Sequence, residues 1–184
     1  MGGALAYDLA NSPGVERVIL ADINLDRARE VARLIGTNVD PVELDSRSPA
    51  QVVDTMKRAA VAIGATTYTH NFGLTEAAIR AGVHFCDLGG NMDVVYRQIS
   101  LDGHARAAGV CIIPNCGLAP GLACVVAAQG AARFTSVDEI HIRVGGLPLH
   151  PRPPLNYQLV FSPEGLINEY IEPAEAIRGQ SKKE

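Results

Sequence analysis

The chain has 184 residues, of which 47% are hydrophobic and 20% charged, and this ordinary globular composition excludes a disordered chain. Its 20 acidic and 16 basic side chains give a formal charge of −4, and no cluster of basic residues precedes the terminal stretch 181–184, so nothing indicates nucleic acid or an anionic membrane as a partner. A chain of this length holds one core comfortably and two only if both are small.

The cellular context is predicted from apolar stretches and cysteines. Prolines and glycines interrupt the longest apolar stretch, residues 109–132, so we expect no transmembrane helix, and in the absence of a signal sequence we expect a cytoplasmic protein. The cysteines lie among apolar or small residues without C-x-x-C spacing, so we expect reduced, buried thiols and no metal site, with Cys116 the one candidate for a functional thiol. They are Cys86, Cys111, Cys116 and Cys124.

Short apolar runs alternate with helical patterns from the N-terminus to about Ala132, which predicts a parallel sheet with helices on its faces. The first half predicts helix Gly3–Ala10, strand Val18–Ala21, helix Arg27–Ile35, a strand near Val42–Leu44, a helix from Pro49 to about Arg58, and strand Ala60–Gly64. Asn24 or Asp26 is expected to cap the second of these helices, and Ser48 the third.

The second half continues the same alternation. It predicts helix Phe72–Ala81 with Gly82 just past its end, strand His84–Leu88, a helix around Ile99–Ala108, strand Val110–Ile113, and a small-residue helix from Pro120-Gly121 to about Arg133. The fold class is therefore α/β, a Rossmann-like doubly wound parallel sheet.

The pattern changes after residue 133, where we expect a second domain. Residues Glu139–Val144 alternate as in a strand, Leu147–Pro154 contain four prolines and predict an extended connection, and the tail from Ala174 reads as helical. We therefore divide the chain into a dinucleotide-binding domain, 1–133, and the beginning of an α+β substrate or dimerisation domain, 134–184.

The phosphate-binding turn is only partly present. A dinucleotide fold has a strand, a glycine-rich turn and a helix, with an acid about twenty residues further on for the adenosine ribose. Gly2 precedes a small-residue helix, and Asp22 ends the next strand twenty residues later. We expect Gly2 to be the third glycine of the turn, with the first strand and two glycines upstream of Met1. Alternatively, Gly2 only begins a frayed helix and Asp22 caps the next one.

Several sequence blocks, taken together, resemble the saccharopine dehydrogenase-like superfamily, and most closely its lysine 6-dehydrogenase branch. The dinucleotide-domain blocks include Gly2-Gly3-Ala4, Leu20-Ala21-Asp22 and Asp87-Leu88-Gly89-Gly90. The more specific blocks are Val144-Gly145-Gly146-Leu147-Pro148 and Phe161-Ser162-Pro163-Glu164-Gly165.

The resemblance implies an NAD-dependent oxidoreductase, with NADP possible, that oxidises the side-chain amine of lysine. It places Asp22 and its neighbour Ile23 at the ribose, Ala65 and Thr66 at the strand end facing the cofactor, and the loop Asp87, Leu88, Gly89 and Gly90 beside the nicotinamide. The alternatives are a saccharopine-type or carboxynorspermidine-type reductase and a catalytically silent fragment. A homodimer is expected, because the missing strand would leave an open sheet edge.

Catalytic candidates follow from the rule that ligands of open α/β sheets bind at the carboxyl ends of the strands. The rule selects Asp87, Asn115 and Cys116, with Tyr68 and His70 on the loop after strand Ala60–Gly64. Asp87 either acts as a base or caps the glycine turn after it, and Asn115 either touches substrate or orients a loop.

Residues beyond the first domain supply further candidates. Tyr157 either closes over the site or packs locally, and Ser162 either binds ligand or caps the segment after it. Among the histidines, His70 and His150 form the candidate functional pair, whereas we expect His84 and His141 to be structural and His104 to lie on an exposed helix.

Overall fold

The structure is a computed structural model that describes residues 1–154, 156–158, 163–171, 176–178 and 181–183. The chain forms two compact units, Met1–Ser136 and Val137–Glu184, which we call the first and the second unit. No helix among the described residues is both long and apolar enough to cross a membrane.

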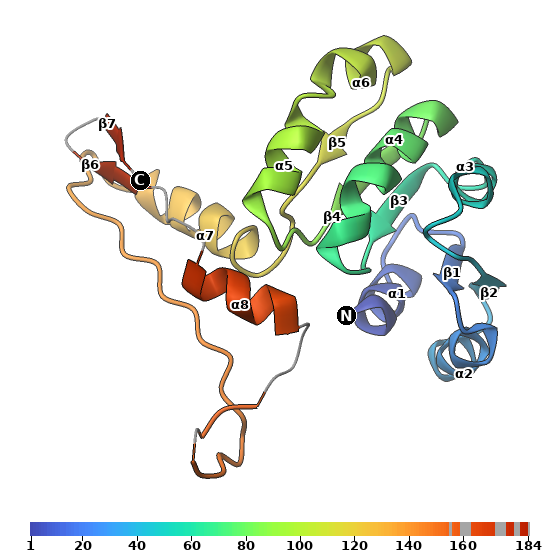
Figure 1. Cartoon of the computed structure of the whole chain (residues 1–184), viewed down its shortest axis with the longest axis horizontal. Coiled ribbons are helices and arrows are strands. Elements are labelled where there is room, and N and C mark those ends of the chain that lie inside the picture. The colour runs from blue at the N-terminus through green and yellow to red at the C-terminus, as the bar shows by residue number, and fades with distance from the viewer. Residues whose placement is uncertain (155, 159–162, 172–175, 179–180, 184) are drawn as a thin grey trace. The chain divides into compact units, whose positions relative to one another are not determined.

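The first unit alternates helices and strands as the sequence predicts (Figure 1). Its elements are α1 (Gly2–Ala10), β1 (Val18–Asp22), α2 (Leu25–Ile35), β2 (Val39–Glu43), α3 (Pro49–Met56), β3 (Val61–Gly64), the 3-10 turn η1 (Tyr68–His70), α4 (Asn71–Ala81), β4 (His84–Asp87), α5 (Met92–Ile99), α6 (Asp102–Ala108), β5 (Ile112–Ile113) and α7 (Leu122–Ala131).

All strand pairs of the first unit are parallel, and they form two sheets. One sheet pairs β1 with β2, from Val18 opposite Val39 to Asp22 opposite Glu43. The other has the order β3-β4-β5, with Gly64 opposite Asp87. Strands β1 and β3 are the terminal strands of their sheets, and no ladder joins them among the described residues. This confirms the predicted Rossmann-like α/β fold.

Helix ends follow the predicted capping chemistry. The side chain of Asn24, not that of Asp26, caps α2 by accepting a hydrogen bond from the Arg27 amide at 3.0 Å. Gly82 ends α4 in the left-handed conformation, with φ 70°, as a residue without Cβ adopts readily. Ser48 stands at the N-cap of α3, but its side chain makes no capping hydrogen bond there.

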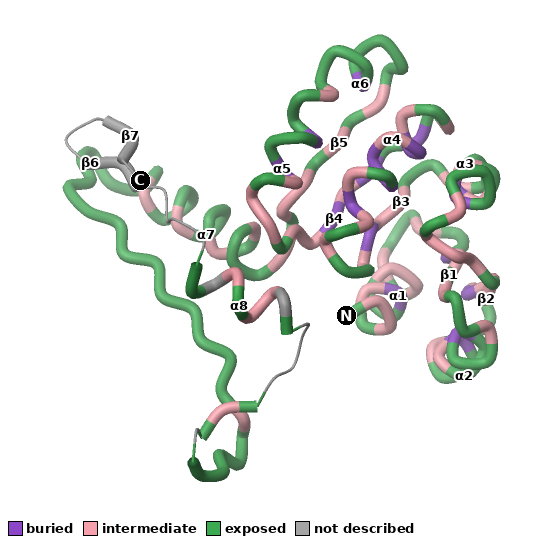
Figure 2. The backbone as a smooth tube through the Cα atoms, in the orientation of Figure 1, coloured by how far each residue is buried: buried purple, intermediate pink, exposed green. Residues whose placement is uncertain are grey.

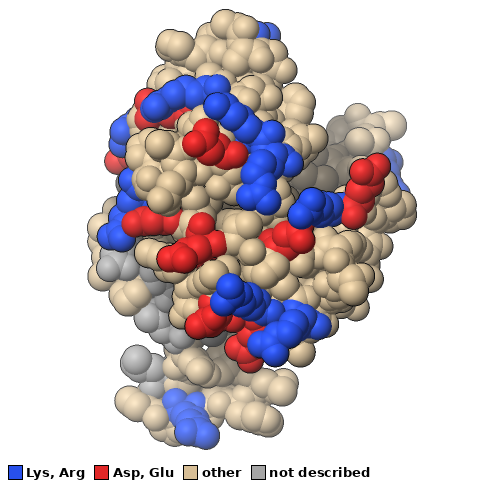
Figure 3. Space-filling view, turned by 90° about the vertical axis from the view of Figure 1, so that its right-hand side faces the viewer, with Lys and Arg blue, Asp and Glu red and all other residues tan. Residues whose placement is uncertain are grey.

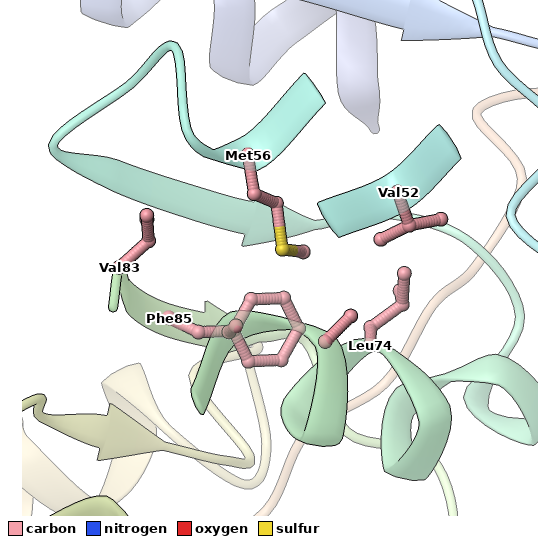
Figure 4. Close-up of a cluster of buried hydrophobic side chains, with 7 residues drawn as sticks. Val52, Met56, Leu74, Val83 and Phe85 are labelled. Carbon is pink, nitrogen blue, oxygen red and sulfur yellow. The ribbon is translucent and has the colours of Figure 1, made fainter. Parts of the chain in front are cut away.

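Two apolar clusters form the core of the first unit. One joins α1 and α2 to the first sheet through Ala6, Val18, Ala32 and Val39. The other joins α3 and α4 to β4, and Figure 4 shows Val52 and Met56 of α3 facing Leu74 and Phe85 across it. Buried residues concentrate in α4 and β4, whereas α7 contains none (Figure 2).

Two predictions inside the first unit need correction. The second strand begins at Val39, earlier than Val42, because Val39 belongs to the buried cluster under α1. The helix expected around Ile99–Ala108 is α6, Asp102–Ala108, but a separate helix before it was missed: α5 begins at Met92, capped by Asn91, whose side chain accepts from the Val94 amide at 3.1 Å. The β-branched pair Val94-Val95 conceals this helix in the sequence, since such residues favour strands.

The second unit departs further from prediction. The strand expected at Glu139–Val144 is absent, because no described segment pairs with it and its alternating residues Ile140, Ile142 and Val144 stay about half exposed. The helical tail is also wrong: β6 (Ala176–Arg178) and β7 (Ser181–Lys183) form an antiparallel pair. A segment this short is unstable as an isolated helix, whereas pairing of the two strands satisfies its backbone hydrogen bonds. The helix α8 (Pro163–Ile171) was not predicted.

Candidate functional site

The candidate site lies at the carboxyl ends of the strands of the first unit. Asp22 ends β1, Gly64 ends β3 and Asp87 ends β4, and the parallel registers place Gly64 directly opposite Asp87. We use the name crest loops for the segments that follow β3, β4 and β5, residues 65–70, 88–91 and 114–121. Open α/β sheets bind their ligands at this edge.

The N-terminus of α1 lies at the first crest loop. Gly2 is the first helical residue, and a methyl group on it would lie 3.7 Å from Cβ of Ala65, directly after β3. The structure thus brings together two residues that the sequence assigned to the cofactor. The neighbouring Thr66 is exposed. The free amides of a helix N-terminus favour an anion such as a phosphate group.

Asp22 stands where the ribose acid was predicted. It is half-buried as the last residue of β1, and its Oδ1 accepts a hydrogen bond from the Asn24 amide at 2.8 Å. The helix cap is Asn24, so the alternative in which Asp22 itself caps α2 does not describe this structure. Ile23 follows with 60% of its side chain exposed.

Asp87 is completely buried and holds the crest loops together. Its Oδ1 accepts from the Gly89 amide at 2.7 Å and from the Asn115 amide at 3.4 Å, while its Oδ2 accepts from Nε2 of Gln98 at 2.6 Å. Its backbone carbonyl accepts from the Cys116 amide at 2.7 Å. Of the two roles that the sequence left open, these contacts are those of a turn cap.

The crest loops fit against one another with little spare room. Gly89 has φ 76°, and a side chain on it would collide with the side chain of Asn115, which itself has φ 61°. A methyl group on Gly90, with φ 126°, would lie 3.0 Å from Cβ of Tyr68. The side-chain nitrogen Nδ2 of Asn115 donates to Sδ of Met92 at 3.5 Å. Asn115 therefore orients a loop here. Leu88, the first residue after β4, is half-buried.

A buried polar chain behind Asp87 was missed by the sequence reasoning. Gln98, Thr75 and Asn71 are each at most 2% exposed, and Gln98 Nε2 donates to Thr75 Oγ1 at 2.8 Å as well as to Asp87. A signal existed: Gln98 follows Val95 by three residues, so it occupies the face of α5 that a core-facing helix fills with apolar side chains.

His70 joins the loop after β2 to the first crest loop. Its Nδ1 lies 2.6 Å from Oγ of Ser46. Nearby, hydrogen bonds from the side chain and the backbone of Arg47 lower the pKa of Asp45 from 3.8 to about 2. His84 is a structural residue in β4, accepting from the Cys111 amide at 2.9 Å, and His104 is exposed on α6 as predicted.

The cysteines correct one expectation. All four are free, but Cys111, Cys116 and Cys124 are exposed and Cys86 is half-buried, because these small residues stand at strand ends and on the exposed α7 and not beneath the core helices. Burial raises the pKa of the Cys86 thiol, and the nearby Cys116 and Asp87 add to that rise. Partial burial, followed by the charge of Asp87, also raises the pKa of Cys116.

The remaining candidates belong to the second unit. Tyr157 is half-buried there and His150 is exposed, whereas Ser162 lies outside the described residues. His141 is exposed outside any strand, with its Nε2 2.8 Å from Glu139, so its predicted place in a strand is wrong. The site described above is built from the first unit alone.

Acidic and basic side chains are intermingled on the face of the molecule drawn in Figure 3. The described residues also form ion pairs at the surface, among them Arg29 with Asp26 and Arg47 with Asp45. Such exposed pairs contribute little to stability.

Parallel α/β units with a helix N-terminus and a carboxylate at the carboxyl ends of their strands define a dinucleotide-binding domain of the Rossmann type. Residues 1–113 match the family model of the saccharopine dehydrogenase NADP binding domain, and residues 117–184 match that of the saccharopine dehydrogenase C-terminal domain. The chain belongs to the saccharopine dehydrogenase family, and this membership indicates a nicotinamide cofactor.

The solved structures that are similar to the chain include the two that follow. Apo L-Glu-forming saccharopine dehydrogenase from Saccharomyces cerevisiae matches 99% of this chain and 41% of its own, at 18% identity and a TM-score of 0.70. An NAD binding oxidoreductase from Klebsiella pneumoniae matches 72% of this chain and 35% of its own, at 23% identity and a TM-score of 0.48. The chain therefore spans less than half of the yeast enzyme, whose similarity supports the fold.

Proposed function

We propose that the protein is an NAD(P)-dependent oxidoreductase that acts on a carbon–nitrogen bond of an amino acid, by oxidative deamination of the lysine side-chain amine. The observations that carry the proposal are the approach of Gly2 to Ala65 at the carboxyl end of β3 and the carboxylate of Asp22 at the carboxyl end of β1, in a chain of this family. A helix N-terminus and a strand-end carboxylate match the phosphate and ribose ends of a dinucleotide.

The residues predicted to bind the cofactor have the following roles in this proposal. Gly2 allows the pyrophosphate to approach the α1 amides, and Asp22 with Ile23 binds the adenosine ribose. Ala65, Thr66 and the loop Leu88–Gly90 line the nicotinamide end. A carboxylate at Asp22 favours the free ribose hydroxyl of NAD, whereas Arg27 and Arg29 on the following helix reduce the penalty for NADP.

The residues of the crest divide into those that shape the site and those that handle protons. The cofactor supplies the hydride chemistry when it is bound. Asp87 and Asn115 hold the loops, since their polar groups are engaged within the protein. His70 is the crest residue with an imidazole, the side chain that most often accepts a proton in catalysis.

A saccharopine-forming or related reductase is the second candidate. The family model over the first 113 residues is described as NADP binding, which favours a reductive direction. The two candidates differ in the substrate that the site accepts: lysine alone with NAD, or an amino acid together with a carbonyl compound and NADPH.

Two further properties belong to the proposal. The protein functions as a homodimer, and α7 supports this because it is apolar and buries none of its side chains. The protein resides in the cytoplasm, a reducing compartment that suits four unpaired cysteines.

Cofactor titration tests the proposal directly. NADH and NADPH are titrated into the chain, and Asp22→Ala is expected to weaken NADH binding by roughly tenfold, because a charge-assisted hydrogen bond to a ribose hydroxyl is lost. Asp26→Ala is the matched control: Asp26 is an exposed acid in the first turn of α2 and pairs only with Arg29 in the described chain. Absence of binding to either nucleotide contradicts the proposal.

Turnover separates the two candidate reactions. Lysine with NAD should produce reduced cofactor, followed by its absorbance, if the deaminating activity is present. Oxidation of NADPH that requires both an amino acid and an aldehyde, with no signal from lysine and NAD, would establish the reductase instead.

A further inference from the structure

The polar chain behind the crest is the most deeply buried set of polar side chains in the described part of the molecule. Asp87 and Thr75 are 0% exposed and Gln98 is 2% exposed. They come from three elements, β4, α4 and α5, and none of them belongs to a crest loop. Buried polar groups are costly unless they are paired, so this arrangement requires an explanation.

The donors and acceptors of this chain have one consistent arrangement. The Thr75 hydroxyl donates to the Asn71 carbonyl at 2.9 Å and accepts from Gln98 Nε2 at 2.8 Å. The second hydrogen of the Gln98 amide is donated to Asp87 Oδ2 at 2.6 Å. Both hydrogens of the amide nitrogen are thus used, whereas Gln98 Oε1 has no partner in the described structure. Gln98 acts here as a donor.

The packing of α5 against α4 places this donor next to Asp87. The guanidinium of Arg97 lies 4.0 Å over the ring of Phe72, and Val95 is buried on the same helix, so α5 is fixed against α4 beside Gln98. One oxygen of the Asp87 carboxylate is therefore held from behind by Gln98. The other oxygen faces the crest and accepts the Gly89 and Asn115 amides.

We propose that Gln98 is a positioning residue for the cofactor end of the site: by holding the Asp87 carboxylate, it orders the crest loops 88–91 and 114–121. Its effect on cofactor affinity rests on the proposed function, whereas its effect on loop order does not. The competing explanation is that Gln98 merely fills space in the core, in which case the loops keep their order without its amide.

A reciprocal exchange of the pair tests the proposal. In Gln98→Glu two carboxylates face each other, and neither donates to the other when both are ionised. Because a proton shared between them would restore a donor, Gln98→Met, which cannot donate in any protonation state, is measured beside it. In the double variant Asp87→Asn/Gln98→Glu, the amide introduced on β4 donates to the carboxylate introduced on α5, and its oxygen still accepts the Gly89 amide. Gln51→Glu is the matched control, because it makes the same change of charge at an exposed site on α3.

Hydrogen exchange of individual amides is the first measurement. In Gln98→Glu the Gly89, Asn115 and Cys116 amides should exchange at least about fivefold faster, relative to the amides of β1 and α2, because a buried acceptor has lost its donor. The double variant should restore them to within about twofold, and Gln51→Glu should leave them unchanged. Equal acceleration of all amides, or no rescue by the double variant, would overturn the proposal.

A second variant covers the event that Gln98→Glu does not fold. Gln98→Met keeps the length of the side chain and removes the donor without adding a charge, so it should accelerate the same three amides selectively. Unchanged exchange of these amides in Gln98→Met would show that Gln98 only fills space, and the proposal would fail.

Nucleotide binding then separates this inference from the proposed function. If the parent chain binds NADH or NADPH, Gln98→Glu should weaken binding at least about fivefold and the double variant should recover it. If the parent chain binds neither nucleotide, the proposed function fails while the exchange experiment still decides the role of Gln98. Selective loosening of the loops without any change in affinity would refute the role of Gln98 at the cofactor end.

Discussion

At the residue scale, Asp22 and Asp87 both stand at the carboxyl end of a strand but have different surroundings. Asp22 is half-buried with one oxygen engaged by the turn after it, so it lies where a ligand can reach. Asp87 is fully buried, and its oxygens accept from an amide of each flanking loop and from Gln98. Burial and occupied lone pairs, more than position, distinguish a structural carboxylate from a ligand-binding one.

Gly89 gives the sharpest test of the packing between the crest loops. Gly89→Ala places a side chain at φ 76° and against the side chain of Asn115, so both the backbone conformation and the contact are unfavourable. We expect a loss of about 1–3 kcal/mol in the free energy of unfolding, measured by urea denaturation.

Gly103→Ala is the matched control for this substitution. Gly103 lies inside α6, and a methyl group there would meet nothing within 4 Å, so the change should stabilise by about 0.5–1 kcal/mol. If Gly89→Ala were as harmless as Gly103→Ala, the close fit of the loops would be disproved.

At the element scale, the alternation of strands and helices was predictable because most elements of the first unit have a clear local signal, α5 being an exception. Asn24 precedes a periodic apolar pattern and Gly82 follows one, and a helix begins after the first and ends at the second. The segment 139–144 shows the limit of such reasoning, since alternation describes a strand that has a neighbour and no described strand pairs with this one.

In the candidate site, too, the sequence could suggest some residues and not others. Gly2 and Asp22 became candidates through their spacing, the helix that follows Gly2 and the strand that ends at Asp22. Gln98 could not be placed, because its role depends on a contact across eleven residues with Asp87 and across 23 with Thr75, which only the packing of α5 on α4 creates. Loop contacts such as Asn115 with Gly89 are likewise products of tertiary structure.

The cluster between α3, α4 and β4 depends most on Phe85. Its side chain is 2% exposed, and a methyl group on Gly64 of the neighbouring strand would lie 2.9 Å from its ring. Phe85→Ala should lower the free energy of unfolding by about 3–5 kcal/mol, as measured by urea denaturation. Phe134→Ala, at a ring that is 70% exposed, should change it by less than about 0.5 kcal/mol. Similar effects of the two substitutions would contradict the placement of this core.

At the scale of the whole molecule, the exposed apolar surface on α7 is the feature with most consequence. Leu122, Val125 and Val126 are 56%, 59% and 61% exposed, and the helix has no charged side chain. Large exposed apolar patches on a folded protein commonly mark surfaces that associate. This surface is a second reason to expect a homodimer, beside the open sheet edge expected from the sequence.

Sedimentation at several protein concentrations tests the association. Val126→Glu should shift the chain toward monomer, because a carboxylate would be buried in the contact. Leu34→Glu is the control, since it changes an 80% exposed leucine on α2, away from α7 in the sequence. A parent chain that stays monomeric at every concentration, or an equal shift in both variants, would contradict a contact through α7.

The division of the parallel strands into two sheets has a consequence for how the molecule loses its structure. Because β1-β2 and β3-β4-β5 share no ladder in the described chain, breaking one sheet does not require breaking the other. Each sheet also has its own apolar cluster. Melting should therefore pass through a partly folded species in which one half has opened and the other persists, and the free energies of unfolding predicted above are those of the transition of the half that holds β3, β4 and β5.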